Sequence, residues 1–128
     1  ITAVQSDFGT ELRSLLDQAD VVIEASRPRA MRQLGIDPVE IAPTCWVSIT
    51  AYGRSGPWSD RVGFGDDTAV AGGLVAWEDS TPVFVADAVA DPLAGLHAAV
   101  AAQACLVTGR AELVDVSLRD VAAYVAGS

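Results

Sequence analysis

The amino-acid sequence predicts a mixed α/β fold with a mainly parallel sheet and flanking helices. Short β-branched runs alternate along the chain with stretches of helical apolar periodicity, and this order is typical of βαβ units. The chain has 128 residues, of which 51% are hydrophobic. That is enough for one hydrophobic core, so we expect residues 1–128 to form a single α/β unit.

Helical signals in the first half of the chain come from leucine spacing and from capping patterns. Residues 10–19 place leucines on one helix face, with Thr10 as a candidate N-cap. Residues 26–35 combine an early proline with a final glycine, as a short helix does. The pattern "DPVE" at residues 37–40 predicts a further helix start.

Two strands and a long loop are predicted between and after these helices. The run "DVVIEA" at residues 20–25 is typical of a strand buried on both faces of a parallel sheet. The run "CWVSIT" at residues 45–50 predicts the second strand. Residues 51–67 are rich in Gly, Ser and Pro, which predicts a surface loop, and loops of this length are usually functional.

The second half repeats the alternation. We expect a small-residue helix over residues 67–76, in which a Gly-Gly pair is costly unless another element packs close to it. A short strand at residues 82–86 precedes a long helix over residues 91–108. A strand at residues 112–118 then leads to a last helix near Arg119.

Charge and composition argue against several classes of partner. The net charge of −9 provides no cationic field for a nucleic acid. No run of about 18 apolar residues without charges is present, so we expect no membrane partner and a cytoplasmic location. The two cysteines, Cys45 and Cys105, lie far apart in apolar stretches, and there is one histidine. We therefore expect no metal site and no prosthetic group.

Two features of the sequence are open to both a structural and a chemical interpretation. Asp91 precedes a proline at the head of the long helix, where N-capping is its commoner role. All eight cations are arginines, and five of them fall between positions 27 and 61. These five form either a solvated face or a local anion site; Arg27, Arg29 and Arg32, which follow a strand end, are the candidates for a phosphate site.

Four segments in order resemble the class III CoA-transferases, the group that includes formyl-CoA transferase, carnitine CoA-transferase and α-methylacyl-CoA racemase. The segments are "ADVVIEASRPRAMRQLGI", "WVSITAYGRSGPWSDRVGFGDDTAVAGGL", "DAVADPLAGLHAAVAA" and "LVDVSLRD". The resemblance implies a Rossmann-like fold and interlocked homodimers. Because family members are several times longer, it also implies that these residues are a central fragment of the large CoA-binding domain and are inactive alone.

The resemblance also implies a reaction. In these transferases an aspartate attacks an acyl-CoA thioester to form an acyl-aspartyl anhydride and then an aspartyl-CoA thioester, from which a carboxylic acid acceptor takes CoA. That aspartate matches Asp91 in "ADPLAGLH". Acyl-CoA and the acceptor acid are thus the expected substrates.

Departures from the family pattern keep alternatives open. Where transferases read "ENFRPG", this chain reads "EASRPR", so Ser26, Arg27, Arg29 and Arg32 are the candidates for CoA contacts. Phe64 stands where the racemases carry a histidine and where transferases often carry an aromatic residue, and it joins the CoA-binding candidates. A CoA-transferase is the first prediction; a racemase-like enzyme and a noncatalytic binding module of the same fold are the alternatives.

Overall fold

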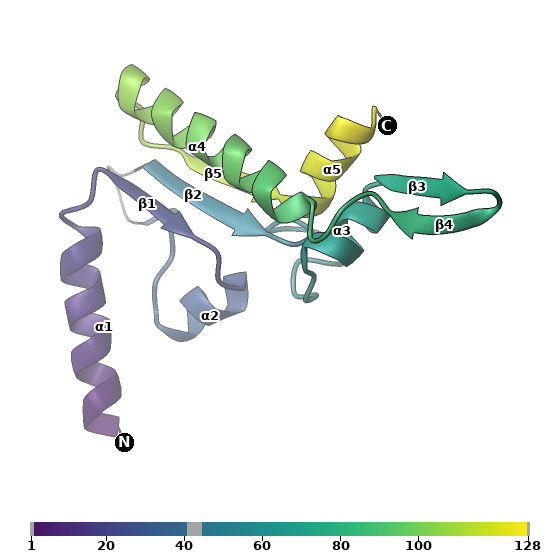
Figure 1. Cartoon of the computed structure of the whole chain (residues 1–128). Coiled ribbons are helices and arrows are strands. Elements are labelled where there is room, and N and C mark those ends of the chain that lie inside the picture. The colour runs from purple at the N-terminus through teal and green to yellow at the C-terminus, as the bar shows by residue number, and fades with distance from the viewer. Residues whose placement is uncertain (1, 41–44, 128) are drawn as a thin grey trace.

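A computed structural model of the chain describes residues 2–40 and 45–127 and has a parallel sheet with helices on both faces (Figure 1). The sheet consists of β1 (Val21–Glu24), β2 (Cys45–Thr50) and β5 (Leu113–Ser117), in the order β1-β2-β5. Both pairings are parallel, with Ile23 opposite Val47 and Trp46 opposite Leu113. The predicted α/β class with a parallel sheet and flanking helices is therefore confirmed.

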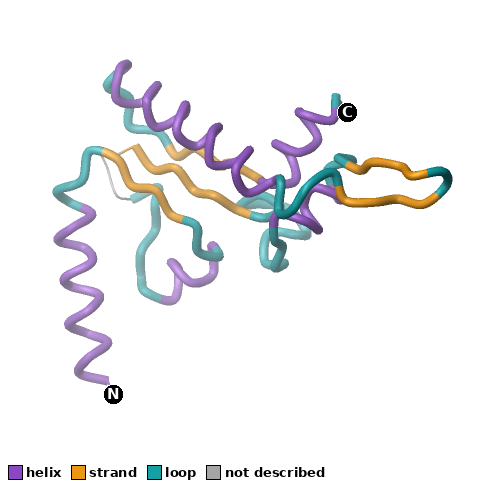
Figure 2. The backbone as a smooth tube through the Cα atoms, in the orientation of Figure 1, coloured by secondary structure: helices purple, strands orange, loops and turns teal. Residues whose placement is uncertain are grey.

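One face of the sheet is covered by α4 (Ala90–Thr108), whereas α5 (Leu118–Ala126) follows β5 at the end of the sheet and packs against α4, as the tube in Figure 2 shows. Alanines at four-residue spacing on α4 allow the helix to approach β2 closely, and they share one buried cluster with Val47. The short helix α3 (Gly65–Ala71) packs against α5 beyond the strand ends. A Cβ on Gly72 would lie 2.5 Å from the Arg119 carbonyl oxygen, so α5 lies close against the end of α3 at the Gly-Gly pair.

The opposite face carries a smaller apolar cluster beneath α1 (Thr2–Leu16) and α2 (Pro28–Gln33). Leu16, Ile36 and Trp46 form its buried centre. Figure 1 shows α1 projecting away from the sheet, which it meets through its last turns. Thr10 lies inside α1, so its prediction as an N-cap was wrong.

Two predictions for the first half of the chain are wrong: the burial of the first strand on both faces and the helix start at residues 37–40. β1 pairs only with β2 among the described strands, and Ile23 is 59% exposed, so this strand is not buried on both faces. The "DPVE" pattern forms a turn, in which the Val39 N–H donates to the Asp37 carboxylate at 3.0 Å. No helix follows as far as residue 40, and residues 41–44 lie outside the described parts of the chain.

A β-hairpin replaces the second half of the helix predicted over residues 67–76. The helix α3 begins at Gly65 and ends at Ala71, because Gly73 adopts a φ of 83° that reverses the chain. The strands β3 (Val75–Glu78) and β4 (Thr81–Phe84) then pair antiparallel. The strand predicted over residues 82–86 thus belongs to this hairpin and not to the parallel sheet.

By length and composition alone, α4 could cross a membrane, since its mean hydropathy reaches 1.3 over an 18-residue window. The helices of soluble cores meet the same criterion. The alanine row of α4 is packed on the sheet, and Asp91 lies in its first turn. This packing buries only 22% of the window, and Leu96, Val100 and Val107 on the other side of the helix are exposed.

Candidate functional site

A cleft of about 290 Å³ opens where β1 and β2 end at their carboxyl termini. Ser26, Arg27 and Phe64, three of the predicted CoA-binding residues, line it together with Arg61. In open α/β sheets, ligands bind outside the carboxyl ends of the strands. The cleft is therefore our candidate site.

A buried polar cluster lies next to this cleft, at the end of β1. The Glu24 carboxylate, at the end of β1, is 7% exposed and accepts hydrogen bonds from Ser26 Oγ and, at 3.0 Å, from Ser48 Oγ. Arg54 Nη1 donates to Ser48 Oγ at 2.9 Å and lies 3.6 Å from Glu24 Oε2. A buried carboxylate without a partner is costly. The ion pair with Glu24 therefore holds the Arg54 side chain at the end of β1.

Asp115 holds the same loop from β5, the strand that flanks β2 on the side away from β1. Its carboxylate accepts from Thr50 Oγ1 at 2.9 Å and from the Arg54 backbone N–H at 2.6 Å. Gly53, between them, has a φ of 92° and donates its N–H to Thr50 Oγ1 at 2.9 Å. Sequence analysis missed Glu24, Arg54 and Asp115 as a unit; the only signal was an acidic residue within each of two apolar strands.

The outer part of the loop is held by an aromatic stack. Tyr52 and Trp58 meet edge to face with ring centroids 5.3 Å apart, and Arg61 Cζ lies 4.8 Å from the Trp58 centroid. The Tyr52 hydroxyl donates to Asp67 Oδ2 at 3.2 Å. Burial, followed by the nearby Asp67 carboxylate, raises the pKa of Tyr52.

Phe64 links the cleft to the beginning of α4. Its backbone N–H donates to Asp67 Oδ1 at 2.6 Å, which starts α3, and its ring is 70% exposed. The next residue, Gly65, lies against Ala88, since an added Cβ would be 2.5 Å from the Ala88 carbonyl oxygen. Ala88 lies three residues before Asp91, so the contact places the start of α4 next to the wall that carries Phe64.

Asp91 is the second residue of α4, and the N-cap is Val89. The prediction of Asp91 as the N-cap was therefore wrong, because the chain turns three residues earlier, at Ala88, whose φ is 45°. The Asp91 N–H donates to the Ala88 carbonyl at 3.0 Å, whereas its exposed carboxylate accepts no hydrogen bond from the described residues. Gly95, one turn later, has no described atom within 4 Å of an added Cβ.

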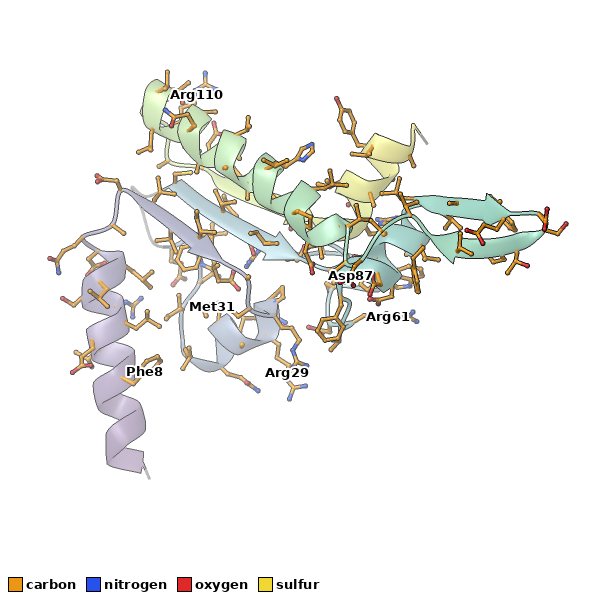
Figure 3. All side chains as sticks on the ribbon, in the orientation of Figure 1. Phe8, Arg29, Met31, Arg61, Asp87 and Arg110 are labelled. Carbon is orange, nitrogen blue, oxygen red and sulfur yellow. The ribbon has the colours of Figure 1, made fainter. Side chains whose placement is uncertain are left out.

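The remaining predicted arginines do not converge on the cleft. Arg29 lines a smaller notch of about 170 Å³ beside α2, and this notch shares Arg27 with the cleft. Arg32 Nη2 lies 3.4 Å from Asp60 Oδ1 in an ion pair that is exposed on both sides. Figure 3 shows Arg29 and Arg61 near the carboxyl ends of the strands, and Arg110 at the other end of the sheet.

The single histidine belongs to another part of the molecule. His97 Nδ1 lies 2.9 Å from the Leu93 carbonyl oxygen, and its ring meets Tyr124 edge to face at 5.9 Å. It lines a cavity along β5 that is separate from the cleft. Within residues 2–40 and 45–127, no group of three His, Cys, Asp or Glu side chains is arranged to hold a metal ion.

The sequence profile of CoA-transferase family III matches residues 7–128. The chain belongs to this family, as its four ordered segments predicted. It is 30% identical over 127 residues to a succinate–glutarate CoA-transferase of Agrobacterium fabrum, an alignment that covers 89% of this chain and 31% of the relative. It is 34% identical over 139 residues to an (R)-2-hydroxy-4-methylpentanoate CoA-transferase of Clostridioides difficile, covering 98% of this chain and 35% of the relative.

Solved structures agree with this assignment. A crystal structure of the hypothetical protein Rv3272 from Mycobacterium tuberculosis superposes with a TM-score of 0.82 at 29% identity, over 93% of this chain and 38% of that one. A CAIB/BAIF family protein from Brucella suis gives 0.81 at 30% identity, over 91% and 34%. The chain thus spans about a third of the length of these relatives, and it corresponds to a partial segment of the family.

Proposed function

We propose that the complete protein containing this chain transfers CoA from an acyl-CoA to a carboxylic acid, with Asp91 as the nucleophile. The observation that carries the proposal is the position of the Asp91 carboxylate. It is exposed, free of hydrogen bonds from the described residues, and located in the family's aspartate motif next to the Gly65–Ala88 contact. A capping carboxylate would instead be bonded to backbone N–H groups.

The proposed reaction proceeds through two covalent intermediates on Asp91. One carboxylate oxygen attacks the thioester carbonyl carbon, and the C–S bond breaks to release CoA thiolate and leave an acyl-aspartyl anhydride. The thiolate then attacks the Asp91 carbonyl carbon, which releases the first acid and forms an aspartyl-CoA thioester. The acceptor carboxylate repeats the sequence in reverse and leaves as the new acyl-CoA, so Asp91 is regenerated.

The open face of α4 suits an attack by Asp91. Gly95 lies four residues on, on the same side of the helix, and adds no side chain to the space beside the carboxylate. A glycine inside a helix costs about 1 kcal/mol relative to alanine. Since nothing in the described structure packs against Gly95, we propose that the space admits the thioester.

The cleft supplies the binding surface for CoA in this proposal. Ser26 and Arg27 lie at its β1 side, and Phe64 forms the wall nearest α4. Arg29 extends the cationic surface along α2, while Arg32 is already paired with Asp60 and contributes less. Rigid walls matter because the attacking and attacked atoms must be held in near-contact geometry.

Racemisation fits the site less well. Moving a proton at carbon requires an acid/base group in the cleft, and Phe64, which stands at the racemase histidine position, has none. His97 is bonded to its own helix and faces the cavity along β5. Acyl transfer needs no such histidine.

Replacing Asp91 with asparagine tests the proposal. The amide keeps the shape of the side chain but cannot form the anhydride, so we expect Asp91→Asn to lose CoA exchange by about a thousandfold or more. The assay is transfer of labelled CoA between an acyl-CoA and a carboxylic acid by the complete protein. Hydroxylamine added during turnover should convert Asp91 to its hydroxamate, which mass spectrometry detects.

Asp79→Asn is the matched control. Asp79 lies in the hairpin turn with a φ of 56°, a conformation that asparagine tolerates equally well. We expect this variant to retain wild-type exchange. Retention of most activity by Asp91→Asn would refute the role of Asp91 as nucleophile. If the wild type exchanged CoA with none of the acyl-CoA thioesters tested, the noncatalytic alternative would be favoured.

A further inference from the structure

The two cysteines, which are far apart in the sequence, meet at the amino end of the sheet. Cys45 is the first residue of β2, and Cys105 lies in the last turn of α4. Both belong to the buried cluster between α4 and the sheet, and they are 4% and 6% exposed. The Cys45 thiol is hydrogen-bonded to the Cys105 thiol. The fold thus brings two free thiols from different elements into contact.

A pocket of about 380 Å³ lies beside this thiol pair. Cys45 and Cys105 both line it, together with residues 17–20, which connect α1 to β1, and with Arg110 after the end of α4. Figure 3 shows Arg110 at this end of the molecule, far from Arg61. The pocket shares no lining residue with the cleft at the carboxyl ends of the strands. A small molecule can therefore approach the two thiols without entering that cleft.

Most cysteines in an apolar cluster only fill space and are unreactive. Two observations distinguish this pair: the thiols contact one another, and one pocket is lined by both. We infer that Cys45 and Cys105 are a thiol oxidation site, at which a low-molecular-weight disulfide converts the pair into a reversible disulfide between β2 and α4. This modification is independent of the proposed CoA transfer.

The reaction consists of two thiol–disulfide exchanges. The Cys105 thiolate attacks one sulfur of the small disulfide, whose S–S bond breaks, so that one small thiolate leaves and a mixed disulfide remains on Cys105. The Cys45 thiolate then attacks the Cys105 sulfur, and the second small thiolate leaves. The two leaving thiolates take up the protons of the two cysteines. Two protein thiols are thus oxidised while one small disulfide is reduced to two thiols.

The environment of Cys45 determines the order of the two steps. Burial, and then the neighbouring Cys105, raises the pKa of Cys45 to about 12. Little thiolate is therefore present at Cys45, and the thiolate is the attacking form. Cys45 acts in the second step, in which the contact with Cys105 gives the mixed disulfide a high effective concentration. The product suits the cluster because a disulfide introduces no charge among apolar side chains.

The test exposes the complete, native protein to oxidised glutathione, blocks the remaining thiols with N-ethylmaleimide and digests the protein without a reductant. Mass spectrometry should find the peptides of Cys45 and Cys105 joined by a disulfide, and dithiothreitol should separate them. Cys45→Ser and Cys105→Ser are a matched pair of variants. Cys45→Ser should stop at a glutathione mixed disulfide on Cys105. In Cys105→Ser, the remaining Cys45 should react at least about tenfold more slowly than Cys105 does in Cys45→Ser.

Three results would overturn the inference, and two of them need no variant to fold. If the wild-type thiols reacted in urea and not in the native protein, the pair would be an inert part of the core. If the wild type accumulated a glutathione mixed disulfide without the internal disulfide, the two sulfurs would not be aligned for exchange. If Cys45 alone reacted faster than Cys105 alone, Cys105 would not be the attacking thiol. None of these results bears on Asp91, since the assay contains no CoA.

Discussion

Two adjacent rows of residues on α4 differ in almost every physical respect. The sheet-facing row is formed by alanines that are at most 9% exposed, whereas the next row contains the exposed Asp91 and the open position Gly95. The buried row consists of Ala90, Ala94, Ala98 and Ala102. One helix thus carries a buried row of alanines beside an exposed carboxylate.

The difference separates stability from proposed chemistry within a single element. Small side chains on the buried row fix the distance between α4 and β2, so they determine where the Asp91 carboxylate lies relative to the sheet. The open row contributes little to the core. Substitutions on the first row should therefore change the free energy of unfolding, and substitutions on the second should change turnover.

The largest expected effect on folding comes from overfilling the buried row. Ala98 is 2% exposed and lies in the main cluster against the sheet, so Ala98→Leu should lower the free energy of unfolding by about 1–3 kcal/mol. Urea unfolding followed by far-ultraviolet circular dichroism measures the change. Ala99→Leu, one residue along on the exposed side, is the control and should stay within about 0.5 kcal/mol. Equal losses in the two variants would contradict the distinction between the rows.

Substitution of Gly95 should have a smaller effect on the free energy of unfolding, and one of opposite sign. Because an added Cβ meets no described atom, Gly95→Ala should raise the free energy of unfolding by about 0.5–1 kcal/mol through helix propensity. The same methyl group would narrow the approach to Asp91, so CoA exchange should fall by about tenfold or more. Exchange assays and urea unfolding on one preparation measure both quantities.

Gly9→Ala sharpens this test. Gly9 lies inside α1, and an added Cβ there also meets nothing within 4 Å. Its substitution should give a similar gain in stability without loss of exchange. A fully active Gly95→Ala variant would show that the space over Gly95 has no role in the reaction.

Local patterns predicted much of the sheet and its covering helices. The strands at residues 20–25, 45–50 and 112–118 and the helix at residues 91–108 each agree with an observed element to within a few residues. In these segments the apolar period and the burial in the fold coincide. The hairpin was missed because Gly72 and Gly73 were read as helix interior, and the chain reversal at Gly73 depends on its positive φ.

The site was less predictable, because its bonds join residues distant in sequence. Arg54 and Asp115 are 61 positions apart, yet the Arg54 N–H donates to the Asp115 carboxylate. Phe64 and Asp91 were predicted from family motifs, but their connection through the Gly65–Ala88 contact appears only in the fold. The N-cap error at Asp91 had a local cause, since the positive φ of Ala88 is unusual for alanine and no sequence rule signals it.

Alkaline pH offers the mildest test of the buried row, which Cys105 extends toward the amino end of the sheet. Burial, and then the adjacent Cys105, raises the pKa of Cys45 from 9.0 to about 12. In the unfolded chain the thiol loses its proton near pH 9, whereas in the folded chain it remains protonated to higher pH. The Cys45 contribution to stability is therefore fully present below pH 9 and is lost as the pH rises toward 12.

We expect the urea midpoint to fall between pH 8.5 and 10.5 and to fall less steeply in Cys45→Ala, with a residual slope from Tyr52, whose pKa is also raised. An identical slope in the two proteins would mean that the thiol beneath α4 is accessible to water, and that the amino end of this row is less tightly packed than its centre at Ala98.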